Sequence, residues 1–587
     1  MVDEAATAAR AVEQWLVAFE GALNDTRCSA LRALFHDDSH WRDVLALTWR
    51  IETVNGSASL SGSLREAAVR ARARGFRIDP SRTPPRRVMR AGREAIEAIL
   101  AFETDVGRCN GVLRLTPSAL ASEPYKAWTL ATVLDEIEGH EEKVGRRRPS
   151  GQVFSRDFRG PNWFDRRKSA AAYADRDPAV LVVGAGQAGL AIAARLGQLG
   201  IDTLMIERNA RVGDNWRNRY HALTLHNQVH VNHFPYMPFP PGWPTYLPKD
   251  KLAGWFEAYA ELMEINTWTG TELESGEWDE RAACWLVSIR RADGTQRTMR
   301  PRHVVMATGA SDTPSIPDIP TLEVFEGTVV HSGHFGSGDE WTGKRALVMG
   351  TGTSGHDIAQ DLHASGASVS VVQRSSTMVV NIEPSAQLPY TLYEEGPPLA
   401  DCDLLTVGLP FPVLKRAYQI LTAEGAHIDK PLLDRLTARG FRLDLGEEDT
   451  GWQMKYLTRG GGYYFNVGCS DLIADGKIGL VQSTDIDAFE AGGARLRNGD
   501  RLAADLVVLA TGYKGQEELV RRLFGAEIAD RVGPIWGFGE GQELRNMFTR
   551  TPQPGLWFMA GSFAQCRIYS KYLALAIVGA EAGLIGD

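Results

Sequence analysis

Apolar and polar positions follow two different periods along the chain. From Ala179 onward, short runs of β-branched residues lead into stretches with an apolar residue every three or four positions, the order expected of parallel βαβ units. Residues 179–208 predict a strand, a glycine turn, a helix and a second strand, and residues 345–374 repeat that order. We therefore predict an α/β fold that contains two Rossmann-type dinucleotide-binding domains.

The second of these units begins only after the first is well advanced. The first reaches HVVMATGA at residues 303–310, whereas the second reaches LVVLATGY at residues 506–513. We therefore predict that the second domain is inserted into the first. The predicted ranges are residues 166–340 and 513–587 for the first domain and 341–512 for the inserted one.

The remaining segments do not follow the βαβ order. Residues 10–53 show two helical patterns and then the strand-like alternation ALTWRIETV, and NGVLRL from Asn110 predicts another strand. We predict a small α+β domain with a charged, Gly- and Pro-containing linker over residues 1–165. A predicted helical insertion at residues 381–468 either walls off a substrate pocket or serves as a structural cap.

Composition is that of an ordinary globular protein. Hydrophobic residues make up 44% and charged residues 23%, which excludes disorder as an overall description. The net charge of -9, with Lys and Arg scattered, gives no footprint for nucleic acid or an anionic membrane, so we expect a small-molecule partner. The start of the chain lacks an apolar signal region, and ALAIVGAEAGLIG is too short to span a bilayer, which predicts a cytoplasmic location.

The six cysteines stand far apart, without a C-x-x-C pair or zinc-ligand spacing. We therefore expect isolated thiols and no metal site. The missing C-x-x-C also argues against a disulfide reductase, which needs a pair of redox thiols beside its cofactor.

The first glycine turn has the G-x-G-x-x-G spacing at Gly184, Gly186 and Gly189. These glycines permit a tight turn, a close approach of backbone to a pyrophosphate and close helix–strand packing. Glu207, followed by Arg208, ends the next strand, where an acidic side chain accepts hydrogen bonds from ribose hydroxyls. This set predicts a dinucleotide site, and we assign it to FAD.

The second turn holds Gly350, Gly352 and Gly355, with Ser354 inside it. Its following strand ends at Gln373 without an acid, and Arg374 and Ser375 come next. An arginine there pairs with the 2′-phosphate of NADP, which an acid would repel, so we predict NADPH. A solvated surface role for Arg374 and use of NADH as well both stay open. One site for a flavin and one for a nicotinamide together imply hydride transfer.

A third motif lies between the two predicted domains. In FEGTVVHSGHF, the residues Phe325, Gly327, His331 and Phe335 fit F-x-G-x-x-x-H-x-x-x-[YF], which resembles the fingerprint of class B flavoprotein monooxygenases. Gly336 follows where that family has Lys or Arg. Further segments that resemble this family are RVGDNWR, with Gly213, Asn215 and Trp216, and ATGY, with Thr511 and Gly512.

The resemblance covers roughly residues 178–587 and implies FAD, NADPH and dioxygen as reactants. It also implies oxygen transfer through a C4a-peroxyflavin, which must be sheltered from water. Within this resemblance, counting back from PFP at residues 238–240 places His226 at the position where flavin-containing monooxygenases carry a catalytic asparagine. YUCCA-type enzymes resemble this chain in having a histidine at that position. The adjacent Asn227 is the alternative, and a packing role for His226 is another.

The N-terminal region is similar to the cone-shaped fold of nuclear-transport-factor-like and SnoaL-like proteins. Its fusion to a flavin monooxygenase resembles type II flavin-containing monooxygenases, several of which perform Baeyer-Villiger oxygenation. Packing or homodimer formation is the expected role of this region, and an independent site is the alternative, formed by His36, Asp37, His40 and Asp43. Near the C-terminus, a helix that starts near Gln565 is expected to direct its amides toward the flavin ring, with Arg567, Tyr569 and Lys571 either at the site or against the cone.

The leading prediction is an FAD-dependent, NAD(P)H-consuming monooxygenase that converts cyclic ketones to esters or lactones. An imidazole can govern the proton that distinguishes attack on a carbonyl from oxygen transfer to an amine or sulfide, which an amide cannot do, and we expect this role for His226. The alternatives are N- or S-oxygenation, YUCCA-like oxidative decarboxylation, and a flavin reductase that passes electrons to a protein partner.

Overall fold

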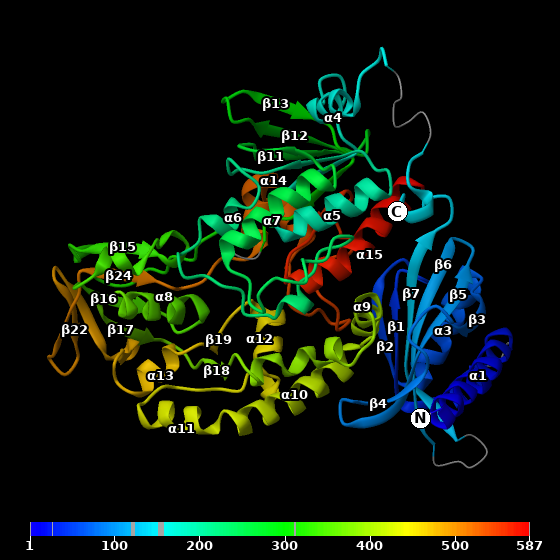
Figure 1. The fold of residues 1–587 in the computed structure, drawn as a ribbon, viewed down its shortest axis with the longest axis horizontal. Helices are drawn as coiled ribbons and strands as arrows, with labels where there is room; N and C mark the ends of the chain where they lie inside the picture. The colour runs from blue at the N-terminus through cyan, green and yellow to red at the C-terminus, as the bar shows by residue number, and fades with distance from the viewer. Residues whose placement is uncertain (1, 26–27, 119–123, 151–157, 310–312, 586–587) are drawn as a thin grey trace.

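The computed structural model describes residues 2–25, 28–118, 124–150, 158–309 and 313–585, arranged as Figure 1 shows. In its N-terminal part the described strands form a seven-stranded sheet in the order β2-β1-β7-β6-β5-β3, with β4 paired to β5. Helices α1 and α3 lie against it. The elements are α1 (Val2–Asn24), α2 (Cys28–Ala33), β1 (Phe35–Val44), β2 (Ile51–Asn55), α3 (Ser57–Ala71), β3 (Arg74–Ile78), β4 (Arg86–Arg90), β5 (Arg93–Thr104), β6 (Gly107–Pro117) and β7 (Tyr125–Ile137).

The predicted strand ALTWRIETV is wrong over its first half. Residues 45–50 turn between β1 and β2, and only the second half continues as a strand. The carboxylate of Asp43 holds this turn by accepting hydrogen bonds from the backbone N–H groups of Leu47 and Thr48. A buried turn without Gly or Pro gives no local signal in a sequence.

A parallel sheet of five described strands, β10-β9-β8-β14-β25, forms the centre of the molecule. Strands β8, β9, β14 and β25 are buried along their whole length, as expected for a parallel sheet covered on both faces. Helices α5 and α15 pack together beside it. The bounds are β8 (Val180–Val183), α5 (Gln187–Gln198), β9 (Thr203–Ile206), β10 (Asn266–Trp268), β14 (His303–Met306), β25 (Leu556–Phe558) and α15 (Phe563–Glu581).

A second parallel sheet, β15-β24-β16-β17-β20, is built entirely from chain between β14 and β25. The predicted α/β class, with one dinucleotide-binding fold inserted in another, is therefore confirmed. The exact domain ranges stay predictions, and β15 joins the second sheet although it precedes residue 341. The bounds are β15 (Thr328–His331), β16 (Arg345–Met349), α8 (Thr353–Ala364), β17 (Ser368–Gln373), α13 (Cys469–Ala474), β20 (Gly479–Gln482) and β24 (Leu506–Leu509).

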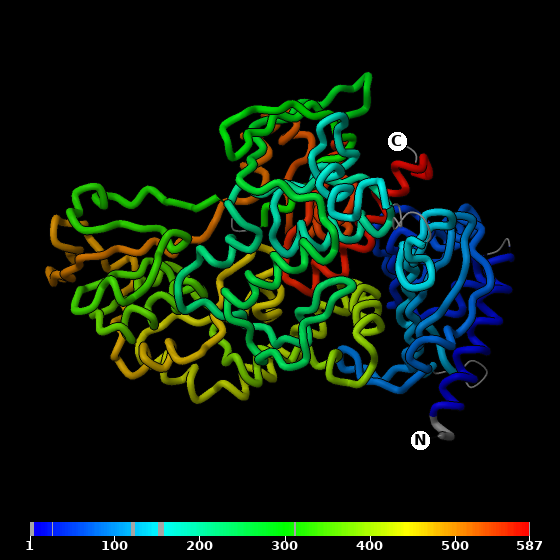
Figure 2. Tube along the Cα trace, turned by 45° about the horizontal axis from the view of Figure 1, so that its top comes forward, coloured from blue at the N-terminus to red at the C-terminus, as the bar shows by residue number. Residues whose placement is uncertain are grey.

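Helices fill the segment between β17 and α13, and a two-stranded pair, β18 and β19, joins them to the second sheet. Figure 2 shows the N-terminal domain at one end of the molecule and the second sheet at the other, with the first sheet between them. Helix α9 lies next to the N-terminal sheet in Figure 1. The bounds are β18 (Met378–Asn381), the 3-10 helix η7 (Ser385–Glu394), α9 (Leu399–Val407), α10 (Phe411–Ile428), α11 (Lys430–Ala438), α12 (Gly451–Arg459) and β19 (Tyr463–Asn466).

Smaller elements complete the fold. They are α4 (Trp163–Ala172), α6 (Asp214–Arg217), α7 (Lys249–Leu262), β11 (Glu272–Asp279), β12 (Cys284–Arg290), β13 (Gln296–Met299), β21 (Ile486–Glu490), β22 (Gly493–Leu496), β23 (Arg501–Ala503) and α14 (Gln516–Val532). Within the described residues, no helix combines the length and the apolar character needed to cross a membrane.

Candidate functional site

A cavity of about 1860 Å³ lies between the two parallel sheets, and both glycine turns line it. Its wall also includes segments that follow the strands β9, β17 and β14, at the carboxyl ends where α/β folds bind ligands. The predicted residues on this wall are Gly184, Gly186, Glu207, Arg208, Asn215, Trp216, His226, Gly350, Gly352, Ser354, Gly355, Arg374, Ser375, Thr511 and Gly512.

Glycine is required at the three positions of the first turn for different structural reasons. Gly184 has φ +105°, and a Cβ there would lie 2.7 Å from the carbonyl oxygen of Ala307. At Gly189 a Cβ would lie 1.8 Å from the carbonyl oxygen of Gly184, so only glycine lets α5 pack this closely on the turn. Gly186 faces the cavity, where a Cβ would approach Asn215 Nδ2 at 3.2 Å.

The second turn repeats this geometry. Gly350 has φ +121°, and its Cβ would lie 2.4 Å from the carbonyl oxygen of Ala510. A Cβ at Gly355 would lie 2.1 Å from the carbonyl oxygen of Gly350. At Gly352 a Cβ would meet no described atom within 4 Å, because this position opens on the cavity. The middle glycine of each turn therefore presents backbone without a side chain to the cavity, and the space beside it is widest at Gly352.

Two charged side chains mark the strand ends beside these turns. The buried carboxylate of Glu207 accepts hydrogen bonds from the backbone N–H of Ala185 at 2.8 Å and from Asn209, and it lines the cavity. Arg374 also lines the cavity, and its guanidinium makes no hydrogen bond or ion pair to the described residues. It is thus available to an anion, as the predicted 2′-phosphate contact requires.

Several buried polar atoms of the cavity wall lack a partner within the part of the chain that the structure describes. A buried donor without a hydrogen bond is costly, so such atoms indicate that a polar ligand belongs beside them. Together with the two open glycine positions, they fit a pair of dinucleotides. The atoms are Trp216 Nε1, Arg219 Nε, Thr308 Oγ1 and Tyr513 Oη.

His331, from the fingerprint between the domains, supports the wall from behind. Its Nε2–H donates to the carbonyl oxygen of Gly512 at 3.0 Å, and its Nδ1 accepts from the backbone N–H of Gly333 at 3.1 Å. Burial lowers the pKa of His331, which suits a neutral ring that both donates and accepts. This histidine therefore fixes the segment that crosses between the two sheets at Gly512, and it does not itself line the cavity.

The two candidate catalytic residues, His226 and Asn227, have different surroundings in the structure. His226 lines the cavity with its side chain 17% exposed, and its Nε2 lies 3.8 Å from Asp357 Oδ2 on α8. Asn227 turns the other way and donates from Nδ2 to the hydroxyl of Tyr390 at 3.0 Å. Of the two predicted residues, His226 is the one that the structure brings to the cavity wall.

Asp357 is a site residue that the sequence reasoning missed. The hydroxyl of Tyr220 donates to Asp357 Oδ2 at 2.6 Å, the same oxygen that faces His226. Burial raises the pKa of Asp357, while the nearby His226 and the Tyr220 hydrogen bond oppose that rise. The only sequence signal was its place in GTGTSGHDIA, one turn into the helix that follows the second glycine turn.

Three other predicted residues lie off the cavity wall. Gly213 has φ +91°, and a Cβ there would lie 2.5 Å from the carbonyl oxygen of Ala253, so it serves the packing of α6 on α7. Gly189 serves packing as described above. Gln565 accepts at Oε1 from the Tyr456 hydroxyl and from the backbone N–H of Ser562, in a capping box at the start of α15.

The residues of the alternative site in the N-terminal domain have other partners, and Asp37 accepts a hydrogen bond from the Ser57 hydroxyl at 3.1 Å. His36 contacts Thr116, and His40 contacts Asn55. Asp43 is occupied by the turn before β2. Among the described residues, no group of three or more His, Cys, Asp or Glu side chains is placed to hold a metal ion.

Several known proteins are similar to this chain in sequence or in fold. Residues 181–394 match the family described as pyridine nucleotide-disulphide oxidoreductase. Indole-3-pyruvate monooxygenase YUCCA1 of Oryza sativa subsp. japonica is 31% identical over 349 residues, which are 57% of this chain and 77% of that protein. The protein named probable indole-3-pyruvate monooxygenase YUCCA4 of Arabidopsis thaliana is also 31% identical, over 57% of this chain and 76% of its own.

A solved structure described as oxidized steroid monooxygenase bound to NADP has a TM-score of 0.52 with this chain at 19% identity. It covers 69% of this chain and 85% of its own, and this likeness supports the fold alone. The sequence relatives, the two glycine turns and the shared cavity have one common explanation. The chain belongs to the flavin-containing monooxygenase family and is an enzyme of that type.

Proposed function

We propose that this monooxygenase inserts oxygen next to a carbonyl carbon, and that the leading reaction is Baeyer-Villiger conversion of cyclic ketones to lactones or of open-chain ketones to esters. One observation carries the proposal. His226 lies on the wall of the cavity that both glycine turns share, with the carboxylate of Asp357 3.8 Å from its Nε2.

The chain's own residues fit the two cofactors. The proposed FAD contacts are the first turn, Glu207 and Trp216, and the proposed NADP contacts are the second turn and Arg374. Held by these residues, the two cofactors would supply hydride transfer to the flavin and the activation of dioxygen for transfer to the substrate. The charge on Arg374 supports the proposal that NADPH is used in preference to NADH.

Carbonyl oxygenation differs from amine or sulfide oxygenation in the protonation state of the oxygen that attacks the substrate. Attack on a carbonyl carbon needs an anionic oxygen nucleophile, so a neighbouring group has to hold the proton that this oxygen would otherwise keep. His226 can hold that proton at Nε2, because the carboxylate of Asp357 stabilises an imidazolium and the Tyr220 hydroxyl keeps that carboxylate in place. We therefore assign His226 as the proton-holding group and Asp357 as its positioning residue.

A second candidate is the oxidative decarboxylation of an aromatic 2-oxo acid. It is supported by the relatives that are named indole-3-pyruvate monooxygenases. It also begins at a carbonyl carbon, so the same histidine would serve it. Arg219, whose Nε has no partner within the described structure, lies on the wall where a substrate carboxylate or a cofactor phosphate would meet it.

Some assignments concern the whole chain. We propose that the N-terminal sheet with α1 to α3 is a nuclear-transport-factor-like domain, and that the chain belongs with the type II flavin-containing monooxygenases. A cytoplasmic location and a homodimer are part of the same proposal. The absence of membrane-spanning helices among the described residues and the cone-like arrangement of sheet and helices are its support.

A product analysis tests the reaction. The purified enzyme is incubated with NADPH, ¹⁸O₂ and three sets of compounds, which are cyclic ketones, aromatic 2-oxo acids, and sulfides with amines. We expect one labelled oxygen in a lactone. Labelled acid with release of carbon dioxide would support the second candidate, and label confined to sulfoxides or N-oxides would contradict carbonyl oxygenation.

His226→Asn tests the proton role. We expect lactone formation to fall about 100-fold or more, in the range of general acid–base effects, while flavin reduction by NADPH persists. The matched control is His230→Asn, on the same segment but off the cavity wall. Full lactone formation by His226→Asn, with an unchanged pH profile, would refute the assignment.

A further inference from the structure

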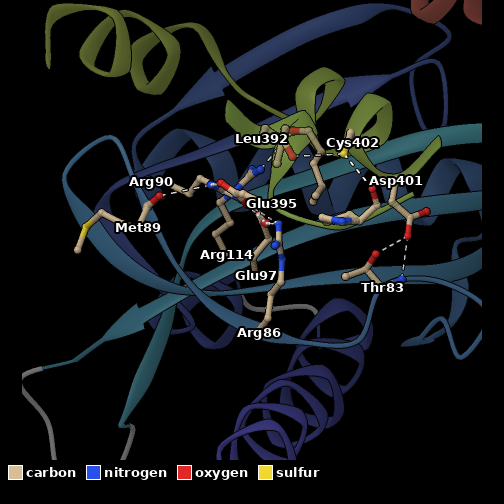
Figure 3. A network of polar contacts seen from close by, with 12 residues as sticks. Thr83, Arg86, Met89, Arg90, Glu97, Arg114, Leu392, Glu395, Asp401 and Cys402 are labelled. Carbon is tan, nitrogen blue, oxygen red and sulfur yellow. Dashed lines mark hydrogen bonds and ion pairs between the residues drawn. The ribbon is translucent and has the colours of Figure 1, made fainter. Parts of the chain in front are cut away.

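The face of the N-terminal sheet that meets the helical insertion carries buried charge. Glu97 on β5 is 2% exposed and Arg114 on β6 is 1% exposed, and Arg114 Nε donates to Glu97 at 2.9 Å. Arg86 and Arg90 on β4 reach the same carboxylate at 3.0 Å and 2.8 Å (Figure 3). Buried charges are retained only when they are paired, so this cluster is a built feature of the interface.

The cluster does not end inside the N-terminal domain. Arg90 Nη1 and Arg86 Nη2 also donate to Glu395, at 2.7 Å and 2.8 Å, and Glu395 is the C-cap residue directly after η7. Three arginines thus share two carboxylates, one from each side of the interface. The side chain of Glu395 is 30% exposed and those of Arg90 and Arg86 are partly buried, so removing the charge of Glu395 would leave two partly buried arginines with less compensating charge.

A second contact lies at the start of α9. The side chain of Asp401 is 3% exposed and accepts from the backbone N–H of Thr83 at 2.8 Å, from the Thr83 hydroxyl at 2.5 Å and from Arg82 at 3.0 Å. Cys402 Sγ, next to it, donates to the carbonyl oxygen of Leu392 in η7 (Figure 3). The N-terminal domain therefore holds both η7 and α9.

From η7, hydrogen bonds lead directly to the segment that carries His226. Gln387 Nε2 donates to the carbonyl oxygen of His226 at 3.2 Å. The Tyr390 hydroxyl accepts from Asn227 at 3.0 Å. Both residues belong to η7, so the position of this short helix sets where the backbone of His226 lies.

From α9, a second route reaches the other end of the same segment. Asp403 pairs with Arg567 on α15 at 2.8 Å and 2.7 Å. Arg567 Nη1 in turn donates to the carbonyl oxygens of Val231 and His233 at 2.7 Å and 2.9 Å. The segment from His226 to His233 is thus tied at both ends to helices that the N-terminal domain holds.

We propose that the N-terminal domain acts as an intramolecular clamp, which positions the segment from His226 to His233 on the wall of the cavity. The domain clamp consists of Arg86, Arg90 and Thr83 on the N-terminal side and Glu395 and Asp401 on the insertion side. Glu395 and Asp401 are positioning residues that act through η7 and α9 on the segment of His226. This inference rests on the proposed function and extends it. If His226 were displaced, NADPH oxidation would become uncoupled from oxygenation and would yield hydrogen peroxide.

The uncoupled reaction needs only NADPH, a proton and dioxygen. NADPH, a proton and O₂ give NADP⁺ and H₂O₂ when no oxygen atom reaches the substrate. Its yield per NADPH consumed therefore measures how well the cavity wall is placed. Binding of NADPH at the second glycine turn does not involve the domain clamp, so KM for NADPH separates a positioning effect from general damage.

The test uses the full-length enzyme with bound FAD and two variants, Glu395→Gln and Asp401→Asn. Glu94→Gln is the matched control, because Glu94 pairs with Arg87 at 2.8 Å on the same hairpin and, among the described residues, no hydrogen bond or ion pair joins it to the insertion. We expect a rise of several-fold in H₂O₂ per NADPH for the two variants, with flavin content and KM for NADPH unchanged, and no rise for the control. The conservative Asp401→Glu should restore part of the coupling.

A second measurement does not depend on the reaction. Amide hydrogen exchange of residues 222–234 and 385–394 should become about tenfold faster in Glu395→Gln and Asp401→Asn, while the central parallel sheet keeps its protection. Unchanged exchange in these segments would overturn the inference, even if the enzyme oxygenates ketones. Faster exchange in an enzyme that oxygenates none of the compounds would uphold the clamp and refute the proposed function.

Discussion

At the scale of single residues, glycines with one sequence motif serve two purposes. Gly352 has an extended φ of -80° and faces open space, so alanine fits its backbone and projects into the cavity. Gly355 faces the carbonyl oxygen of Gly350, and a side chain there collides with backbone. The first turn repeats this division between Gly186 and Gly189.

This division predicts opposite effects for two alanine substitutions. Gly352→Ala should leave the thermal unfolding midpoint unchanged and raise KM for NADPH about tenfold, a loss of about 1.4 kcal/mol. Gly355→Ala should cost about 1–3 kcal/mol of folding free energy, because α8 has to move away from the turn. Thermal unfolding and steady-state NADPH oxidation measure both. A stable Gly355→Ala with normal KM would show that the packing is looser than the geometry implies.

At the scale of elements, the start of α15 shows how a helix end is shared between folding and function. Ser562 accepts from the backbone N–H of Gln565, and Gln565 accepts from that of Ser562, so both side chains satisfy backbone groups. Gly561, just before them, lines the cavity and accepts from Gln187 on α5 at 3.1 Å. The capping box therefore fixes where the chain passes the cavity.

Loss of this cap should weaken the helix end and the cofactor site together. Ser562→Ala is expected to cost about 1 kcal/mol and to speed the release of FAD on dilution, because Gly561 loses its support. Ser562→Asp keeps an acceptor at the same place and serves as the control. Equal unfolding midpoints and equal FAD release for the two variants would contradict the role of the cap.

At the scale of the whole molecule, charge joins parts that are far apart in the sequence. Arg42 on β1 pairs with Glu543 at 2.6 Å, and Arg195 on α5 pairs with Glu142 at 3.0 Å. The arginine cluster around Glu97 is the most buried of these contacts. Burial raises the pKa of Glu97, but the charges of Arg114, Arg90 and Arg86 outweigh it and lower the pKa to about 2.

This shift predicts acid sensitivity with a definite sign. A carboxylate whose pKa is lower in the folded state than its ordinary 4.5 contributes stability above pH 4.5 and loses it as pH falls toward 2. For Glu97 that contribution is about 3 kcal/mol. Thermal unfolding between pH 5 and pH 2 should show a steep decline that is shallower in Glu97→Gln. Equal slopes for the two proteins would place the acid-sensitive group elsewhere.

The sequence by itself determined the features that depend on local spacing. Glycines at fixed offsets after a buried strand can satisfy only a few backbone geometries, so Gly184 and Gly350 identified both turns, and the order of the repeats identified the insertion. Arg374 was found by the same logic, because its place at the end of the strand follows from the motif. Such signals lie within a few residues of each other, so they can be recognised in the sequence without the structure.

Tertiary structure alone decided the contacts between distant segments. Asp357 faces His226 only because α8 of the inserted domain packs beside a loop of the first. Glu395 and Arg90, 305 residues apart, meet only because the N-terminal sheet docks on the insertion. Charge pairing acts over a few ångströms in space, and no periodicity along a chain records which distant carboxylate will come within that reach.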